Sequence, residues 1–455
     1  MSIAFCLIEL YMGDNETISI WKVVGILGGI LLTDFFLFPL AFAFFPYGNT
    51  KIYMALAAII ILLFRGREFI TEKGSRVFII LCCYALSVSF VNFISIVVNN
   101  TPDYTYVSYI ISMLVWLGGA FSLVCYLDNL HDGLSVRVIA YYLLTVCALQ
   151  CISALLIDNN VGFYNVVCQL IKDQKGTLEY ADGRLCGISC AFDPAGIRFS
   201  AVLVISLFLL PKFLADKDVK IWSKTLFLIG IAIVVIVGNM ISRTTTVGAI
   251  MGMAYVLYAV TFGRMLDLNQ KFSTFKWLLI ILIVTIPTVA YLYNTNYNFR
   301  EELRFGFEGF FSLAESGEWN VHSNNVLENM VVLPDNLKTW LVGDGFFIDT
   351  TQDPYYVGKT YEGYYMNTDI GYLRFIFYFG LIGLLTFTAY FIYVTKACIS
   401  FFPKLWVMFL ALLMLQFIVW FKVATDIFPI FAIFLSWGFI DSKTEYETEK
   451  VGTFG

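Results

Sequence analysis

Charged side chains are scarce in this sequence, and their scarcity excludes an ordinary soluble protein. Asp, Glu, Lys and Arg make up 14% of its 455 residues, whereas a soluble domain averages about 25%. Too little polar surface is present to cover a globule in water, because 59% of the residues are hydrophobic. Repeated apolar runs therefore predict an all-α protein, a polytopic bundle of transmembrane helices.

Other scarce features exclude further classes of protein. No stripe of basic residues is present, so we expect no nucleic acid partner. The chain has 2 His and no clustered ligand motif, so neither a metal nor another cofactor is implied. No glycine-rich phosphate loop lies on the predicted cytosolic side, which disfavours an ATP-driven pump. Cys168, Cys186 and Cys190 fall in a predicted outer loop, where free thiols are favoured over a disulfide.

Apolar segments set the predicted topology of about twelve spans. They are Ile20–Phe45, Ile52–Phe64, Val77–Val98, Tyr106–Leu127, Val138–Ile157, Phe199–Leu214, Trp222–Met240, Val247–Phe262, Trp277–Leu292, Ile370–Val394, Leu405–Phe421 and Ile427–Ile440. Several fall short of the ~20 residues that a span needs. Pairs of small residues, Gly248 with Gly252 and Gly380 with Gly383, are interpreted as helix-packing contacts. Asp34, inside the first segment, is unexplained.

The distribution of Lys and Arg supports this topology. With the N-terminus in the cytosol, short outer loops hold only Lys51, Arg243 and Lys422, and most of the other cations fall in inner loops. Both termini are then cytoplasmic. Residues 1–455 form a single integral membrane domain, in which 158–197 is the first long extracytoplasmic loop and 294–369 is the large one.

Arg residues mark the end of the first long loop. Arg184 lies within Gly183–Gly187, and Arg198 follows Asp193-Pro194 at the entrance to a span. A guanidinium at a membrane boundary can bind phosphate bidentately and keeps its charge when partly desolvated. The alternative is an Arg that snorkels to the interface or pairs with Asp193.

The turn Ser242–Thr246 carries a cation where short outer loops avoid positive charge. Arg243 at this place favours an anionic ligand. The neighbouring hydroxyls and the start of the next helix would add hydrogen-bond donors for a phosphate. The alternative is a simple capped turn.

The large loop and its exit hold further candidates. Either Asp369 or His322 could act as a general base toward a sugar hydroxyl. The alternatives are a helix N-cap for Asp369 and an ordinary exposed side chain for His322. Candidate substrate-binding residues within or just after this loop are Arg300, Arg304, Arg374 and Tyr372.

Taken together, these motifs resemble the O-antigen polymerase and O-antigen ligase superfamily of bacterial membrane glycosyltransferases. The motifs are Arg184-x-x-Gly187 with Asp193-Pro194, Ser242-Arg243, Gly343-Asp344-Gly345, and Tyr372-Leu373 followed by Gly380-Leu-Ile-Gly383. The resemblance covers about residues 180–390. It implies a metal-independent glycosyltransferase that uses lipid-pyrophosphate-linked glycans, with Arg184, Arg198 and Arg243 gripping phosphate. Ligases typically carry His-Asn ahead of the Tyr-Leu helix, where this chain reads Asn367-Thr368-Asp369, and this departure favours a polymerase.

We therefore expect a polymerase of the Wzy type in a bacterial inner membrane, making O-antigen, capsule or exopolysaccharide on the periplasmic face. Its partners would be an undecaprenyl-pyrophosphate-linked oligosaccharide, membrane lipid and a chain-length regulator protein. One alternative is an O-antigen ligase, which moves finished polymer onto lipid A core. Another is a lipid-linked oligosaccharide flippase, which would need two related halves and polar residues at mid-span. A scaffold or sensor would leave the outer Arg residues unexplained.

Overall fold

The computed structural model describes residues 20–45, 47–65, 70–181, 184–263, 266–347 and 363–440. Across these residues the chain is helical, and β-pairing is limited to isolated bridges such as Phe42 with Ile171. The predicted all-α class is therefore confirmed.

Within the described ranges, eight helices are long and apolar enough to cross a membrane. They are α2 (Ile20–Leu37), α4 (Glu72–Asn99), α5 (Tyr109–Leu130), α6 (Val136–Asn159), α9 (Phe192–Ala215), α10 (Ile221–Ile241), α12 (Leu268–Thr295) and α17 (Gly371–Phe401). Each coincides with an expected apolar segment. Their length and composition support a polytopic membrane protein.

The other four expected spans are also helices, but shorter ones. They are α3 (Thr50–Arg65), α11 (Thr245–Thr261), α18 (Trp406–Val419) and α19 (Phe428–Phe439). Their lengths of 16, 17, 14 and 12 residues fall below the ~20 that a span needs. The count of twelve spans therefore stays a prediction, whereas eight helices have the required length.

The first apolar segment is only partly helical. Helix α2 ends at Leu37, and the chain then turns into a short extended stretch. There the amide of Lys172 donates to the carbonyl of Ala41 at 2.9 Å, and the amide of Ala43 donates to that of Leu170 at 2.8 Å. These bonds join the end of the first segment to the first long loop.

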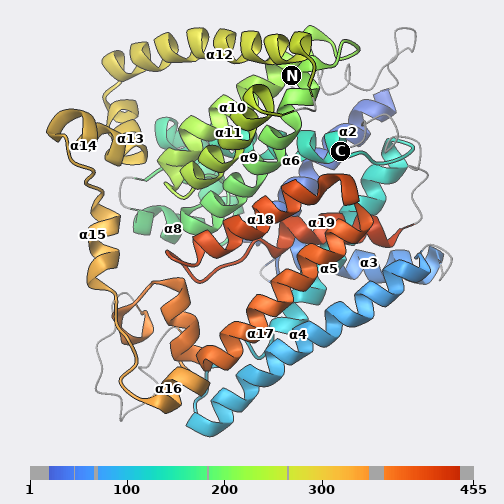
Figure 1. Ribbon diagram of the computed structural model, residues 1–455, viewed down its shortest axis with the longest axis vertical. Helices are drawn as coiled ribbons and strands as arrows, with labels where there is room; N and C mark the ends of the chain where they lie inside the picture. Colours follow the sequence, from blue (N-terminus) through green and yellow to red (C-terminus); the bar gives the residue numbers. More distant parts are fainter. Residues whose placement is uncertain are drawn as a thin grey trace. The chain divides into compact units, whose positions relative to one another are not determined.

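Two compact units make up the fold. Of the described residues, unit 1 contains those within 20–58 and 119–308, and unit 2 contains those within 59–118 and 309–440. In unit 1, α9 is the most buried of the candidate spans and packs against α6, α10, α11 and α12 (Figure 1). A Cβ on Gly248 would lie 2.3 Å from the Ser200 backbone, so the α9 and α11 backbones touch. This contact confirms the predicted packing role of Gly248.

In unit 2, helix α17 packs along α4 and is broken at Gly380 (Figure 1). The φ of Gly380 is 67° and its ψ is −174°, a conformation that is essentially restricted to glycine. The break divides α17 into residues 371–379 and 381–401. Gly380 is thus a break in the helix and also the close packing contact that the sequence suggested, because a Cβ there would lie 2.2 Å from the carbonyl oxygen of Leu341.

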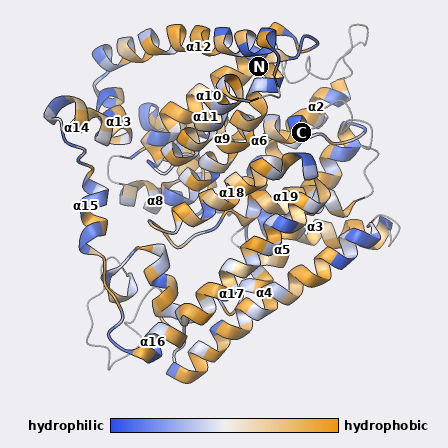
Figure 2. Cartoon of the chain, in the orientation of Figure 1, coloured by the Kyte–Doolittle hydropathy of each residue, from blue (hydrophilic) through white to orange (hydrophobic). Residues whose placement is uncertain are grey.

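The two long loops are largely helical. The first contains α7 (Val161–Leu170) and α8 (Gln174–Ala181). The large loop contains α13 (Tyr297–Gly306), α14 (Glu308–Ser316), α15 (His322–Asn329), α16 (Leu337–Val342) and η2 (Tyr365–Asn367), while residues 348–362 lie outside the described residues. Apolar residues predominate along the long helices, and polar residues are more frequent on short helices of the large loop such as α13 and α15 (Figure 2). The large loop is therefore folded over most of its length.

Candidate functional site

Two of the three expected phosphate-binding residues lie on one aromatic ring of unit 1. The ring belongs to Phe305 on α13. The guanidinium carbon of Arg243 is 4.2 Å from the ring centroid, and that of Arg184 is 5.1 Å from it. Arg243 comes from the α10–α11 turn and Arg184 from the first long loop, so two distant motifs meet at a single side chain. Stacking on the ring stabilises both cations and holds them in the same place.

Arg243 is fixed by α13 and α14. Its Nε donates to the carbonyl of Phe305 at 3.0 Å, and its Nη1 lies 2.7 Å from a carboxylate oxygen of Glu308. The side chain is 17% exposed. Burial lowers the pKa of Arg243, and the charge of Glu308 opposes this effect. The group stays cationic, because an ordinary guanidinium has a pKa above about 12.

Asp193 holds the turn that carries Arg243. Its carboxylate accepts a hydrogen bond from the Thr244 hydroxyl at 2.8 Å and a longer one from the Ser242 hydroxyl at 3.4 Å. A Cβ on Gly196 would lie 2.4 Å from the Ser242 hydroxyl, so α9 and the turn are in close contact. The Asp-Pro motif and the Ser-Arg motif are therefore one structural element.

The loop after Arg184 is held by buried amide side chains. The Gln150 side-chain oxygen accepts from the amide of Ile188 at 2.9 Å, and its nitrogen donates to Asp34 at 2.8 Å. Gln174 donates to the carbonyl of Gly187 at 3.0 Å. These bonds account for the previously unexplained Asp34. A carboxylate on α2 orients the amide that positions the loop behind Arg184.

Cysteines in this loop are free thiols, as are all the others in the described residues. The free-thiol reading of the sequence is therefore confirmed for Cys168, Cys186 and Cys190. Burial raises the pKa of the Cys186 thiol to about 11, so this group is protonated at neutral pH.

Arg198 lies away from the Arg184–Arg243 pair. Gly196 and Ser200 face the α10–α11 turn and α11, as their contacts show. Arg198 is two residues away from Gly196 and from Ser200. Two residues correspond to about half a helical turn, so Arg198 lies on the opposite side of α9. Its guanidinium carbon lies 5.6 Å from the centroid of the Phe38 ring. The expected set of three Arg residues is therefore a pair and a separate third residue.

Arg300 and Arg304 contact the end of α12. The Nε of Arg300 donates to the carbonyl of Tyr293 at 2.9 Å, and Nη1 of Arg304 donates to the Tyr293 hydroxyl at 3.2 Å. A cation at the C-terminus of a helix is stabilised by the unpaired carbonyls and the helix dipole. These contacts give both residues a structural role in joining α12 to α13.

In unit 2, Arg374 and Asp369 form a buried ion pair. Nη1 of Arg374 lies 3.0 Å from the Asp369 carboxylate, and Nη2 donates to the carbonyl of Phe347 at 3.2 Å. The guanidinium lies against the rings of Phe347 and Tyr364, at 4.0 and 4.6 Å. Its side chain is 7% exposed. The helix cap is Ile370, so Asp369 acts here as an ion-pair partner rather than as a cap.

Tyr372 and His322 have different surroundings. The Tyr372 hydroxyl donates to the carbonyl of Phe417 at 3.0 Å, and its ring packs edge-on against Trp420 and Phe421. It anchors the start of α17 to α18. His322 begins α15 and is exposed to solvent.

The Gly343-Asp344-Gly345 motif supports the break in α17. The amides of Asp344 and Gly345 donate to the carbonyls of Phe377 and Tyr378, at 2.5 and 3.1 Å. The backbone leaves the helical conformation at Gly380, just after these two carbonyls. The loop backbone therefore supplies hydrogen-bond donors to α17 at its break.

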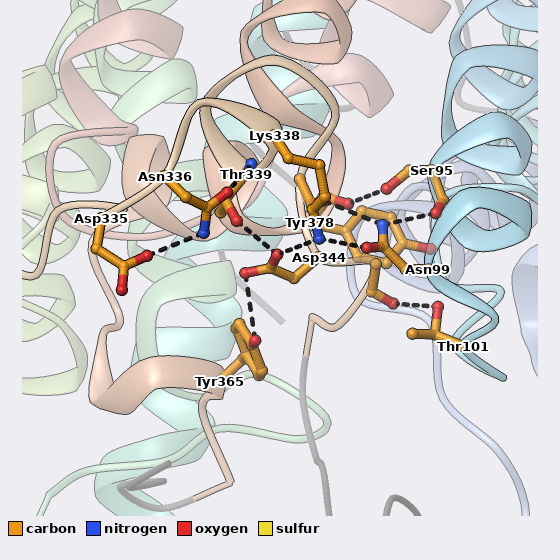
Figure 3. Close-up of polar contacts among 12 residues, drawn as sticks. Ser95, Asn99, Thr101, Asp335, Asn336, Lys338, Thr339, Asp344, Tyr365 and Tyr378 are labelled. Atoms are coloured by element: carbon orange, nitrogen blue, oxygen red, sulfur yellow. Dashed lines mark hydrogen bonds and ion pairs between the residues drawn. The ribbon is translucent and has the colours of Figure 1, made fainter. Parts of the chain in front are cut away.

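Side chains of unit 2 complete this junction (Figure 3). The Asp344 carboxylate accepts from Lys338 at 2.8 Å and from the Thr339 hydroxyl at 2.7 Å. Asn99 of α4 donates to the carbonyl of Gly343 at 3.0 Å and accepts from Lys338. Sequence reasoning missed Asn99 and Lys338, because their meeting depends on the pairing of α4 with the large loop.

Searches against protein-family models, curated proteins and solved structures found no match for this chain.

Proposed function

We propose that this protein is a polymerase of lipid-pyrophosphate-linked oligosaccharide repeat units on the periplasmic face of a bacterial inner membrane. The observation that carries the proposal is the pair Arg184 and Arg243 on the Phe305 ring, beside the start of α11. Two clustered guanidinium groups suit a pyrophosphate group. The eight long apolar helices suit a substrate whose lipid lies in the bilayer.

The proposed reaction transfers a growing glycan from its polyprenyl pyrophosphate to a hydroxyl of an incoming lipid-linked repeat unit. Negative charge on the pyrophosphate rises as its bond to the anomeric carbon breaks. Contacts from Arg184 and Arg243 would therefore strengthen in the transition state, and this differential binding is what accelerates a reaction. The position of Arg198 beside Phe38 suits a supporting role outside this phosphate contact.

Replacement of Arg243 tests the proposal. We expect Arg243→Ala to lower polymerisation at least 100-fold, because removing one preorganised donor costs roughly 10²–10³ in rate. Arg243→Lys should give an intermediate loss, because the charge remains but the fork of donors is lost. The assay is glycan length in cells that lack the chromosomal copy, with the membrane content of each variant measured in parallel.

Arg137→Ala is the matched control. Arg137 belongs to the same unit and pairs with Asp216, but its side chain is 46% exposed. Exposed pairs contribute little, typically about 0–1 kcal/mol. Normal long polymer from Arg243→Ala would refute the proposal. Loss of all attached repeats, including single ones, would instead indicate a ligase.

A further inference from the structure

A buried carboxyl group lies one helical turn from the Phe305 ring of unit 1. Glu302 of α13 is 8% exposed. Within the part of the chain that the structure describes, it has no hydrogen-bond or ion-pair partner. Burial of the residue disfavours the charged carboxylate, and no bonded cation offsets that cost.

The position of Glu302 follows from the contacts of its own helix. Gly306 packs on the backbone of Asn239 and Met240 at the end of α10, and the carbonyl of Phe305 accepts from Arg243. Residues three and four apart share one helix face, with Cβ atoms about 5–6 Å apart. Glu302 therefore lies on the face of α13 that carries Phe305 and Gly306.

The charge that acts on this carboxyl comes from Asp158. Asp158 at the end of α6 raises its pKa by repulsion, in addition to the larger effect of burial, and the resulting pKa of Glu302 is about 8. Arg243 of the α10–α11 turn is engaged with Glu308 of α14, and Arg184 stacks on Phe305. The pKa of Glu302 thus lies near the operating pH, as an efficient general base requires.

We propose that Glu302 is the general base of the reaction, the group that accepts the proton of the acceptor hydroxyl. This inference rests on the proposed function. A base and a leaving group lie on opposite sides of the carbon under attack, so a base should be near the Arg pair but not bonded to it. Glu302 lies one helical turn from Phe305, on which both guanidinium groups stack, and it is bonded to neither of them. Glu308 is the carboxylate that the pyrophosphate would displace from Arg243.

The proposed step balances in atoms and charge. The acceptor oxygen forms a bond to the anomeric carbon of the donor glycan while its proton passes to the Glu302 carboxylate. The bond between the anomeric carbon and the pyrophosphate oxygen breaks, and the polyprenyl pyrophosphate leaves with the electron pair beside Arg184 and Arg243. Glu302 then releases the proton to water, which regenerates the carboxylate.

Glu302→Gln tests the step with a side chain of nearly the same shape. The assay uses the purified full-length protein with lipid-linked repeat units. We expect at least a 100-fold loss of turnover, because general base catalysis contributes roughly 10²–10⁴ in rate. Binding of the lipid-linked substrate should change less than threefold. Glu301→Gln is the matched control, because Glu301 is the exposed neighbour on the same helix.

The pH profile provides a second readout that a purely structural residue would not change. The active form is the carboxylate, so turnover should rise about tenfold per pH unit below 7 and level off above pH ~8. Asp158→Asn removes the repelling charge and should shift this rise to lower pH. A profile that is flat from pH 6 to 9, or unaffected by Asp158→Asn, would overturn the assignment.

Failure of this inference can be told apart from failure of the proposed function. If Glu302→Gln polymerises normally while Arg243→Ala does not, the base assignment is wrong and the glycosyltransferase proposal stands. If Arg243→Ala also polymerises normally, the proposed function itself is wrong. If Glu302→Gln does not accumulate in the membrane, the pH dependence of turnover in Asp158→Asn alone tests whether Glu302 is the general base.

Discussion

Replacing Gly380 with alanine should destabilise unit 2 by about 2–6 kcal/mol, and the structure gives the two sources of this cost. The first is conformational: φ is 67° and ψ is −174° at this residue, a combination that costs a non-glycine residue roughly 1–3 kcal/mol. The second is steric. A Cβ at this position would lie 2.2 Å from the carbonyl oxygen of Leu341 and 2.4 Å from the amide of Val342.

The clash has a structural consequence beyond the contact itself. The Leu341 carbonyl belongs to the backbone of α16, so α16 must move away from α17. This movement would break the bonds from the amides of Asp344 and Gly345 to α17. Each bond contributes about 0.5–1.5 kcal/mol net, so the two add roughly 1–3 kcal/mol to the conformational cost.

Gly317→Ala separates the two sources. Gly317 also belongs to unit 2 and has a φ of 77°, but nothing lies within 4 Å of its Cβ position. It should lose only about 1–2 kcal/mol, the cost of the left-handed backbone. Thermal unfolding of each purified variant in detergent measures the difference. Equal midpoints for Gly380→Ala and Gly317→Ala would refute the argument that the break is a tightly packed junction.

Two further predictions concern the first half of α17. Arg374→Met should cost about 1.5–3 kcal/mol, because it removes the charge-assisted bond to the partly buried Asp369 carboxylate, and adding Asp369→Asn should restore much of the unfolding midpoint. No restoration in the double variant would contradict a role as an ion pair. Tyr372→Phe should cost about 1 kcal/mol, the bond to the carbonyl of Phe417, and leave glycan length unchanged. Shortened glycans from Tyr372→Phe at normal stability would restore the substrate-binding role expected from the sequence.

Much of the helical architecture could be predicted from the sequence, because lipid requires long apolar helices with internally satisfied backbones. Each expected segment contains a helix, although residues 38–45 of the first one are not helical. Their ends were harder to predict. Helix α2 ends at Leu37, two residues before Pro39, which has no amide hydrogen and disfavours a helical conformation in the residue before it. The pairing of Ala41 and Ala43 with Lys172 and Leu170 that follows is a long-range contact, which no local pattern records.

The candidate site was only partly predictable. Arg243 was identified because a cation in a short outer loop opposes the usual charge bias, and Arg184 by its motif. Neither observation could identify Phe305, the residue whose ring contacts both Arg184 and Arg243. Helical periodicity alone could have separated Arg198 from Gly196 and Ser200. The contacts of Arg300 with Tyr293 also had a local signal, a cation just after the end of a helix.

Glu302 and Gln150 illustrate what sequence reasoning could not reach. Glu302 is one of many acidic residues in the large loop, and nothing in the local sequence indicates that it is buried. Its burial arises from the packing of α13 on α10. Gln150 lies inside an apolar run, and its partners Asp34 and Ile188 are far from it in sequence. Both residues depend on tertiary contacts between separate segments.

The break at Gly380 also changes which part of the last long helix can cross a bilayer. An unbroken helix would carry Arg374 and its partner Asp369 toward lipid, where charged groups are expensive even when paired. Residues 381–401 alone supply the ~20 residues that a span needs. The first half, residues 371–379, then need not cross the bilayer. Its side chains pack against Phe347, Tyr364 and Trp420. The glycine that the sequence marked as a packing residue thus allows a charged helical segment to lie directly before a candidate membrane span.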